Sequence, residues 1–434
     1  MNEYDSNRIL DLVKPIGYVP TDNPSEADCY VLNTCHIREK ATDKVYHDIG
    51  RLKKKFRNKK KPMLLVTGCV AQAENVEMLN REKYIDGVVG PQSYHKISEI
   101  IKNIEYKKNK INSTEFDVIE KFDTLNLVKN SNSKISSFLT IQEGCDKFCH
   151  FCVVPYTRGP EFSRSFKEVI NEAKQLVENG SKEITLLGQN VNAYEYKDQS
   201  NTFRLSDIIL ELNEIKKLER IRYTTSHPKD VKKDLIDAHK SCEKLMPVLH
   251  LPLQSGSSKV LNAMNRKHNV SDYYKIIMEL KKVKPEIRFS SDFIIGYPGE
   301  TDEDFNQTLE LIEKVDFINS YSFIYSSRPG TPASKLENVD TDIAKKRLIK
   351  LQSLLQKNNF KYKKILLNKS IEVLFENKLS EKNKYFGRDK FLNSVIVESD
   401  QDLTGQILEV KIDDFNHNSL FGTLLFNKKI NLVA

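Results

Sequence analysis

The stretch FLTIQEGCDKFCHFC, residues 138–152, joins an apolar segment to three closely spaced cysteines. The segment FLTIQ has the composition of a buried β-strand. Cys145, Cys149 and Cys152 follow it within eight positions, and no fourth cysteine lies near them in the chain. We therefore expect a strand whose carboxyl end leads into a loop that carries three thiols.

The segments after this loop alternate between helix and strand patterns. SFKEVINEAKQLVENG has apolar residues at helical spacing, a capping box formed by Ser165 and Glu168, and a stop at Gly180, and the strand pattern EITLLGQN follows it. About six strand–helix units of this kind predict a partial (βα)6 barrel, in which chemistry takes place at the carboxyl ends of the strands. The cysteine loop follows the first of these strands, so we expect it on that face.

Residues 1–105 also alternate between helices and strands, which predicts an α/β domain with a doubly wound parallel sheet. Cys35 ends the strand pattern YVLNTC and Cys69 ends MLLVTGC. Because the carboxyl ends of parallel strands meet at one edge of the sheet, two thiols at equivalent ends favour a shared ligand over two buried core cysteines. The chain opens in a helix where an alternating fold would begin with a strand, so we expect a first strand to be missing.

Two further segments have their own patterns. Residues 106–137 are polar and lack a period, which is typical of a linker or an extended crossover. The tail shows short alternating strand patterns with glycines at the turns, which predicts a small β-barrel. We therefore expect an α/β chain of four parts: an N-terminal domain over 1–105, a linker over 106–137, a partial barrel over 138–366 and a β-barrel over 367–430.

Composition bounds the cellular setting and the partners. The 434 residues are enough for two or three domains. The sequence contains no run of about 18 apolar residues, which is the length needed to span a membrane. The first residues lack the basic and apolar regions of a secretory signal, so we expect a cytoplasmic protein without a membrane partner. The net charge of +8 and the run KKKFRNKKK (53–61) fit either an anionic partner such as RNA or a solvated, lysine-rich surface.

The spacing of the three cysteines distinguishes between two metal centres. Structural zinc is nearly always held by four ligands in separated pairs, and no second pair lies near this loop. A cubic [4Fe–4S] cluster can be bound by three thiolates, which leaves one iron open to a small molecule. The spacing therefore favours such a cluster over zinc and over three buried core cysteines.

The motif CxxxCxxC after the first strand of a partial barrel resembles the radical S-adenosylmethionine (SAM) enzymes, in which the open iron is chelated by SAM. The segments TIQEGCDKFCHFCVVPYTRGPEFSR, LLGQNVNAY, HLPLQSGS and DFIIGYPGET, with MNEYDS, VLNTCHIREKA and GPQSYHK upstream, resemble the tRNA methylthiotransferases. The most similar branch makes 2-methylthio-isopentenyladenosine. The resemblance extends into the tail, which is similar to the RNA-binding TRAM domain. It implies a methylthiotransferase domain, a radical-SAM barrel and a TRAM barrel, in that order.

The resemblance also implies roles for individual residues, although it assigns no catalytic side chain. Cys145, Cys149 and Cys152 would bind the cluster that holds SAM, and Phe151 would pack near the adenine. Gln189 and Asn190 end a barrel strand where the amino group of SAM is usually held. Gln254 and Ser255 end another strand and would face the cofactor. Arg158 and Arg164 could meet SAM or an RNA phosphate. For each of these polar residues a loop-stabilising hydrogen bond is the alternative.

By the same resemblance, a second [4Fe–4S] cluster supplies or carries the sulfur. Two of its three ligands match Cys35 and Cys69. The third would lie in a Gly-Cys turn before MNEYDS, upstream of the first residue of this sequence. Cys29 cannot replace it, because six residues along one strand separate it from Cys35 by roughly 20 Å. We therefore expect a late start codon or a truncation, and a second cluster that binds poorly.

The expected activity follows from this resemblance. The chain would convert isopentenyladenosine beside the tRNA anticodon to its 2-methylthio derivative, with one SAM as methyl donor and a second as radical source. The expected partners are the anticodon stem-loop and an electron donor such as flavodoxin or ferredoxin, and we expect a monomer. One alternative is a sister enzyme that acts on threonylcarbamoyladenosine of tRNA or on an aspartate of a ribosomal protein. Another is a non-catalytic protein that binds zinc and RNA.

Overall fold

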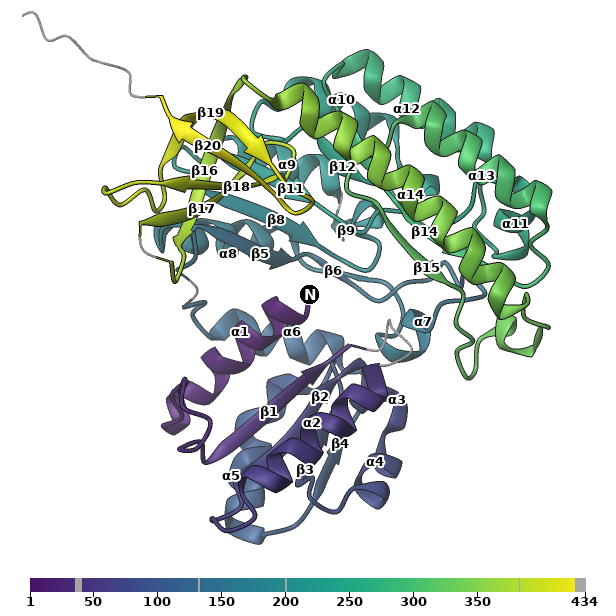
Figure 1. Cartoon of the computed structure of the whole chain (residues 1–434). Helices are drawn as coiled ribbons and strands as arrows, with labels where there is room; N and C mark the ends of the chain where they lie inside the picture. The colour runs from purple at the N-terminus through teal and green to yellow at the C-terminus, as the bar shows by residue number, and fades with distance from the viewer. Residues whose placement is uncertain (36–40, 132, 200, 382, 426–434) are drawn as a thin grey trace, which may run out of the picture.

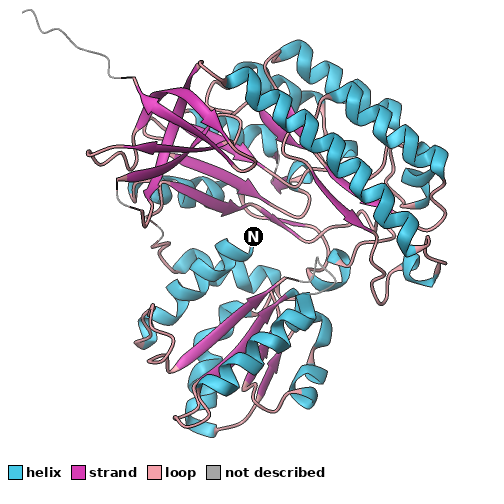
Figure 2. Ribbon diagram, viewed as in Figure 1, coloured by secondary structure: helices cyan, strands magenta, loops and turns pink. Residues whose placement is uncertain are grey.

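The computed structural model describes residues 1–35, 41–131, 133–199, 201–381 and 383–425, and it has three parts (Figure 1). Two parts combine helices and strands, and the third is built from strands alone (Figure 2). Helix α1 (Asn2–Val13) lies between the first part and the second, and its amino end faces the strands of the second. Among the described residues, no helix combines the length and the apolar character that crossing a membrane requires.

The first part is a parallel sheet with helices on both faces, which confirms the predicted doubly wound arrangement. Its strands, in spatial order, are β1 (Cys29–Thr34), β2 (Met63–Gly68), β3 (Gly87–Val89) and β4 (Ile111–Ser113). Leu65 on β2 packs with α1 and α5 (Ile97–Lys107) on one face. Its neighbours Leu64 and Val66 point to the other face, where they pack with α2 (Ala41–Lys55), α3 (Cys69–Glu74) and α4 (Val76–Arg81). This alternation along β2 produces two separate cores.

The polar segment 106–137 is more ordered than its composition indicates. It contributes β4 to the sheet and then helix α6 (Val118–Leu127). Phe122 and Leu125 of α6 are buried in the core that α1 and α5 form. A three-residue strand is too short to show a period, which is why the sequence pattern does not reveal β4. The boundary of the linker at 106 and 137 stays a prediction.

The second part is an open barrel of parallel strands that surround one large core. Its strands are β5 (Ser136–Thr140), β8 (Glu183–Leu187), β11 (Arg220–Tyr223), β12 (Val248–His250), β13 (Arg288–Ser290), β14 (Asp292–Ile295) and β15 (Tyr321–Ile324). The helices on its outer side are α8 (Phe166–Glu178), α9 (Leu205–Asn213), α10 (Lys233–Ser241), α12 (Val270–Val283), α13 (Asp302–Val315) and α14 (Thr341–Leu366). The partial barrel is therefore confirmed.

Some local predictions in this part differ from the structure. Ser165 occupies the N-cap position of α8, but its side chain makes no capping hydrogen bond, so the predicted capping box is wrong. The segment RFSSDFIIGY (288–297), which has the pattern of one continuous strand, is divided into β13 and β14 at Ser291, whose hydroxyl oxygen accepts a hydrogen bond from the backbone N–H of Leu253. This break lets the chain change its pairing from β12 to β15.

The third part is a closed β-barrel, as predicted. It consists of β16 (Ser370–Lys378), β17 (Lys384–Asp389), β18 (Ser394–Glu398), β19 (Ile407–Phe415) and β20 (Ser419–Leu424), in the spatial order β16-β17-β18-β20-β19. Two buried arginines of β11 join it to the open barrel. Arg220 donates to the carbonyl of Arg388 (2.8 Å), and Arg222 donates to the carbonyls of Asp389 and Lys390 (2.9 and 3.0 Å). Since β11 begins at Arg220, the closed barrel lies near the amino ends of the open barrel's strands.

Candidate functional site

The cysteine loop begins after a short strand, β6 (Gln142–Glu143), that pairs with β7 (Phe162–Ser163) beyond the loop. Gly144 opens the loop with a φ of +75°, and a Cβ atom there would lie 1.8 Å from the carbonyl oxygen of Pro160. The backbone N–H of Cys145 donates to the carbonyl of Gly159 (3.1 Å). Only glycine fits this close approach of two backbones, which clamps both ends of the loop.

The middle of the loop is held by distant segments of the barrel. The backbone N–H of His150 donates to the carbonyl of Met264 (3.0 Å), and its carbonyl accepts from Ala333 (3.0 Å). The ring Nδ1 of His150 lies 2.9 Å from the carbonyl of Ala263, and Asn265 Nδ2 donates to the carbonyl of Phe148 (2.9 Å). The loop is therefore fixed by contacts more than a hundred residues away in sequence, which no local pattern reveals.

The three thiols of the loop are shielded from water. Cys149 is buried, while Cys145 and Cys152 are half-buried. Burial, with a smaller contribution from the negative charge of a neighbouring cysteine, raises the pKa of Cys145 to about 12 and that of Cys152 to about 11. Three thiolates in one buried place require a positively charged centre to compensate them. The loop therefore has the donor set and the shielding of a metal centre.

The spacing of the sulfur atoms distinguishes a single ion from a cluster. In the described residues, one group of three or more potential ligands has all its ligand atoms within 4.8 Å of one another, and it does not include these cysteines. Thiolates on one tetrahedral zinc, with Zn–S bonds of about 2.3 Å, would lie roughly 3.8 Å apart. A cube bound at three corners separates its thiolates further. The three sulfurs therefore fit a [4Fe–4S] cluster better than zinc.

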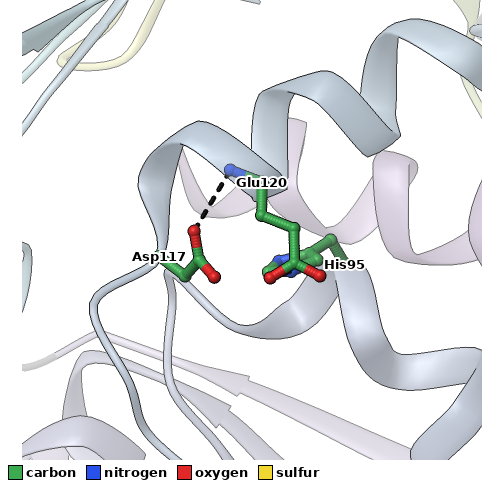
Figure 3. Close-up of side chains that lie close together, drawn as sticks. All are labelled: His95, Asp117 and Glu120. Carbon is green, nitrogen blue, oxygen red and sulfur yellow. Dashed lines mark hydrogen bonds and ion pairs between the residues drawn. The ribbon is translucent and has the colours of Figure 1, made fainter.

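That closer group is formed by His95, Asp117 and Glu120 (Figure 3). Asp117 caps helix α6, because its Oδ1 accepts from the backbone N–H of Glu120 (3.1 Å). Lys96 Nζ lies 3.0 Å from Glu120 Oε2 and 3.7 Å from Asp117 Oδ2. Both carboxylates therefore already form ion pairs with the Lys96 ammonium group. The geometry supports an ion-pair cluster that joins the turn of residues 94–96 to α6.

The strand-end residues Gln189 and Asn190 lie against the cysteine loop. Gln189 Oε1 accepts from the backbone N–H of Gly144 (2.6 Å), which is the loop-stabilising alternative. Asn190 Nδ2 donates to Asp230 Oδ2 (2.8 Å), while its Oδ1 is buried and accepts no hydrogen bond from the described residues. Asp230 also pairs with Lys147 of the loop (2.9 Å). Asn190 thus presents an unused acceptor beside the loop, where an amino group of a ligand could bind.

Gln142 belongs to this site, although no sequence motif singles it out. Its Nε2 donates to the carbonyl of Gly144 (2.7 Å), and its Oε1 accepts from the backbone N–H of Asn190 (3.1 Å). The side chain is buried, so these bonds fix the start of the loop relative to the end of β8. The one available signal is the position of Gln142 as the last residue of the strand pattern FLTIQ, three residues before the first cysteine.

The structure brings the other predicted cofactor residues to the same end of the barrel. Gln254 has a φ of +81° and bridges strands, because its N–H donates to Asp292 and its carbonyl accepts from Ile294 (both 2.9 Å). Ser255 Oγ accepts from the backbone N–H of Ser257 (3.2 Å), so it stabilises a local turn. Phe151 packs against an apolar cluster of the residues Val260, Met264, Tyr297, Tyr325 and Ala333. The contacts of Gln254, Ser255 and Phe151 with a cofactor stay predictions.

Arg158 and Arg164 both pair with carboxylates inside the protein. Arg158 Nη2 pairs with Asp5 Oδ2 at 2.8 Å, and Arg164 Nη1 pairs with Glu172 Oε2 at 2.7 Å. Both side chains are buried. The interpretation as contacts for SAM or an RNA phosphate is therefore wrong, since each guanidinium already has an internal carboxylate.

The second pair of predicted ligands lies at one edge of the first sheet. Thr34 of β1 is in register with Gly68 of β2, so the next residues, Cys35 and Cys69, leave the sheet side by side. A Cβ at Gly68 would lie 2.2 Å from the carbonyl oxygen of Thr34, which shows how closely the ends of β1 and β2 approach each other. Cys29 starts β1 and therefore lies at the opposite edge. The geometry keeps Cys35 and Cys69 as candidates for one shared ligand and separates Cys29 from them.

Comparison with known proteins decides the family. Residues 139–312 match the Radical SAM superfamily, and residues 1–90 match the family described as "Uncharacterized protein family UPF0004". The tRNA-2-methylthio-N(6)-dimethylallyladenosine synthase of Pelagibacter ubique is 59% identical over 429 residues, which cover 99% of this chain and 96% of that protein. The synthase of Rickettsia akari is 47% identical over 433 residues, which cover 98% of this chain and 97% of that protein. The chain belongs to this synthase family.

Membership of the synthase family makes the chain a radical-SAM enzyme, and members of that superfamily use [4Fe–4S] clusters and SAM. The alternative of a non-catalytic zinc- and RNA-binding protein is therefore wrong. Among solved structures, the radical SAM methyltransferase TsrM from Kitasatospora setae, with cobalamin and a [4Fe–4S] cluster bound, has a TM-score of 0.55 at 12% identity. The match covers 76% of this chain and 74% of the TsrM chain. At this identity the likeness shows the fold alone.

Proposed function

We propose that this chain adds a methylthio group to isopentenyladenosine next to the anticodon of tRNA. The observation that carries the proposal is a clamped three-thiol loop at the carboxyl end of the first barrel strand, in a chain 59% identical over nearly its whole length to a synthase named for this product. Carbon 2 of adenine carries an unactivated C–H bond that acid–base groups cannot break, so a radical source is required.

Cys145, Cys149 and Cys152 would hold the cluster that binds SAM. When bound and reduced, this cluster supplies the electron that cleaves SAM to a 5′-deoxyadenosyl radical. The protein's own residues position the reactants. Gln142 and Gln189 hold the start of the loop through both backbone groups of Gly144, and the buried Oδ1 of Asn190 is placed to accept a hydrogen bond from an amino group.

Cys35 and Cys69 would bind a second cluster, the source of the sulfur. Their edge of the sheet faces the open barrel, because α3, which begins at Cys69, packs against α7 (Val154–Thr157) directly after the cysteine loop. The target base must be unstacked to reach the cofactor, and the closed β-barrel is the proposed contact for the rest of the RNA. A flavodoxin or ferredoxin as electron donor, a monomeric state and a cytoplasmic location complete the proposal.

Anaerobic reconstitution tests the metal centre. We expect about four irons per chain for one cluster, little zinc, and an absorbance that bleaches on reduction. The triple variant C145A/C149A/C152A should lose the iron of this cluster. Cys242 is a matched control, because it is buried but bonds to Asn213 Oδ1 (3.0 Å) far from the loop in sequence, so C242S should keep the full iron content. One zinc per chain and no iron would reject the proposal.

The substrate is tested with synthetic RNA and mass spectrometry. An anticodon stem-loop that carries isopentenyladenosine should gain a methylthio group, and SAM should yield 5′-deoxyadenosine. The same stem-loop with unmodified adenosine is the control. Methylthiolation of threonylcarbamoyladenosine, or of an aspartate in a ribosomal protein, in place of isopentenyladenosine would assign the chain to a sister activity instead.

A further inference from the structure

Arg266 lies directly beside the cysteine loop and is not explained by the fold. It follows helix α11 (Ser258–Ala263), and the residues on either side of it, Asn265 and Lys267, both have a φ of +59°. These two left-handed positions turn the chain sharply around Arg266. This arginine is 5% exposed, whereas Lys267 is exposed. The local backbone therefore directs one cation inward and the next one into solvent.

The guanidinium of Arg266 contacts one of the three cluster cysteines. Nη2 donates to the carbonyl of Pro252 (2.6 Å), and Nη1 donates to Cys149 Sγ (3.5 Å). The third nitrogen, Nε, is buried and has no hydrogen-bond partner among the described residues. A hydrogen bond from a charged donor is strongest when its acceptor is an anion, so this contact is better suited to a thiolate than to a thiol.

The charge of Arg266 lacks the carboxylate partner that six other buried arginines have. Six buried arginines each form an ion pair with a carboxylate: Arg8, Arg158, Arg164, Arg220, Arg222 and Arg347. In the described part of the chain, no carboxylate oxygen lies within 4.0 Å of the Arg266 guanidinium. An unpaired buried charge is costly, so this arginine requires an anion that no carboxylate of the described residues supplies.

The other groups near Arg266 supply no negative charge. Burial, together with Arg266, lowers the pKa of His227 far below its ordinary value and that of His268 to about 4. Both imidazoles are therefore neutral near pH 7. Lys147 of the loop is already paired with Asp230. Among the described residues, the side-chain atom that accepts from the Arg266 guanidinium is the sulfur of Cys149.

We propose that Arg266 is the counter-charge of the cysteine-bound cluster and raises its reduction potential through the N–H···S bond to Cys149. This inference rests on the proposed function, because it requires the cluster. Reduction adds one negative charge to the centre, which a fixed neighbouring cation and a hydrogen bond to sulfur both stabilise. The electron comes from a one-electron donor of the flavodoxin or ferredoxin class, and no covalent bond changes. Arg266 is thus a positioning residue that acts through Cys149.

A redox titration of the reconstituted protein without SAM tests this role. The variants are R266Q, which removes the charge, R266K, which keeps the charge but loses the planar fork, and K267Q as a matched control on the exposed neighbour. At the wild-type midpoint potential, the ratio of reduced to oxidised cluster should fall about tenfold in R266Q, which corresponds to 59 mV for one electron. R266K should fall between R266Q and wild type, and K267Q should stay within twofold of wild type.

The outcomes separate this inference from the proposed function. A wild-type protein without a cluster would overturn both. An R266Q protein that keeps its iron and is reduced like wild type overturns the inference alone, and so does a variant whose only defect is weaker SAM binding. If R266Q holds less iron, R266K decides: full iron in R266K supports the need for a positive charge, and equal loss in R266K contradicts it.

Discussion

Arg158 and Asp5 form a buried ion pair across the boundary between the first helix and the cysteine loop, with 2.8 Å between Nη2 and Oδ2. Glu143, the residue before the loop, lies 3.6 Å from Arg158 and 2.6 Å from Lys121 of α6. All four side chains are at most 3% exposed. Since Glu143 precedes the three cysteines and Arg158 follows them, this network fastens both flanks of the loop to the first sheet domain.

The Asp5–Arg158 pair should contribute strongly to stability. Removing one partner of a buried pair leaves an unpaired charge, which typically costs about 3–5 kcal/mol. We expect D5N and R158Q each to lower the free energy of unfolding by that amount, and the double variant to cost much less than the sum. Urea unfolding of the apoprotein measures this. The exposed pair Lys233–Asp237 is the control, since D237N should change stability by less than about 0.5 kcal/mol. Additive effects at Asp5 and Arg158 would contradict the ion pair.

The same pair predicts a pH dependence with a definite sign. Burial alone would raise the pKa of Asp5, but Arg158 and Lys121 outweigh it and hold this pKa below its ordinary value. A carboxylate with a lowered folded pKa stabilises the protein fully above its unfolded value, about 3.9, and loses this contribution as the pH falls through the folded pKa. The stability difference between wild type and D5N should therefore be constant from pH 7 to about pH 5 and shrink below pH 4. A difference that grows on acidification would show the opposite shift.

Gly144 should be intolerant of a side chain. An alanine there would need a φ of +75° and would place its Cβ 1.8 Å from the Pro160 carbonyl, so the loop must move. We expect G144A to lose at least about 2 kcal/mol of stability and most of its iron on reconstitution. Gly180 is the matched control, because its φ is +108° but no atom lies within 4 Å of the position that a Cβ would take. G180A should cost about 1 kcal/mol and keep its iron. Equal iron loss in both variants would argue against the clamp.

How far the sequence predicts this site depends on the sequence distance between its parts. The cysteines at strand ends are recognisable because a strand pattern and a thiol are neighbours in the chain. Arg266 is not recognisable, because it lies 117 residues from Cys149. Arg158 is misinterpreted because its partner Asp5 lies 153 residues away, and a cation next to a cluster loop looks available until that carboxylate is placed. Local patterns thus reveal the donors, while tertiary contacts decide which charges remain unpaired.

The basic run 53–61 is expected to be a solvated surface. It connects the end of α2 to the start of β2 at Met63, so it lies at the edge of the sheet opposite to Cys69. Lys53 already pairs with Glu82 (3.1 Å), and Lys61 pairs with Asp86 (2.6 Å). Changing the four remaining lysines of the run to glutamine should leave tRNA affinity within about twofold and its salt dependence unchanged. The lysines to be changed are Lys54, Lys55, Lys59 and Lys60.

A matched set on the closed β-barrel completes this experiment. It replaces four exposed lysines by glutamine: Lys369, Lys378, Lys390 and Lys411. If this barrel contacts the RNA backbone, each lost phosphate contact reduces the slope of log affinity against log salt by about 0.7–0.9. We expect tRNA binding by this variant to weaken at least about fivefold in a filter-binding series over salt concentration. Weakened binding by the variant of residues 53–61, with unchanged binding by the barrel variant, would place the RNA on the first sheet domain instead, because the charge removed is the same in both.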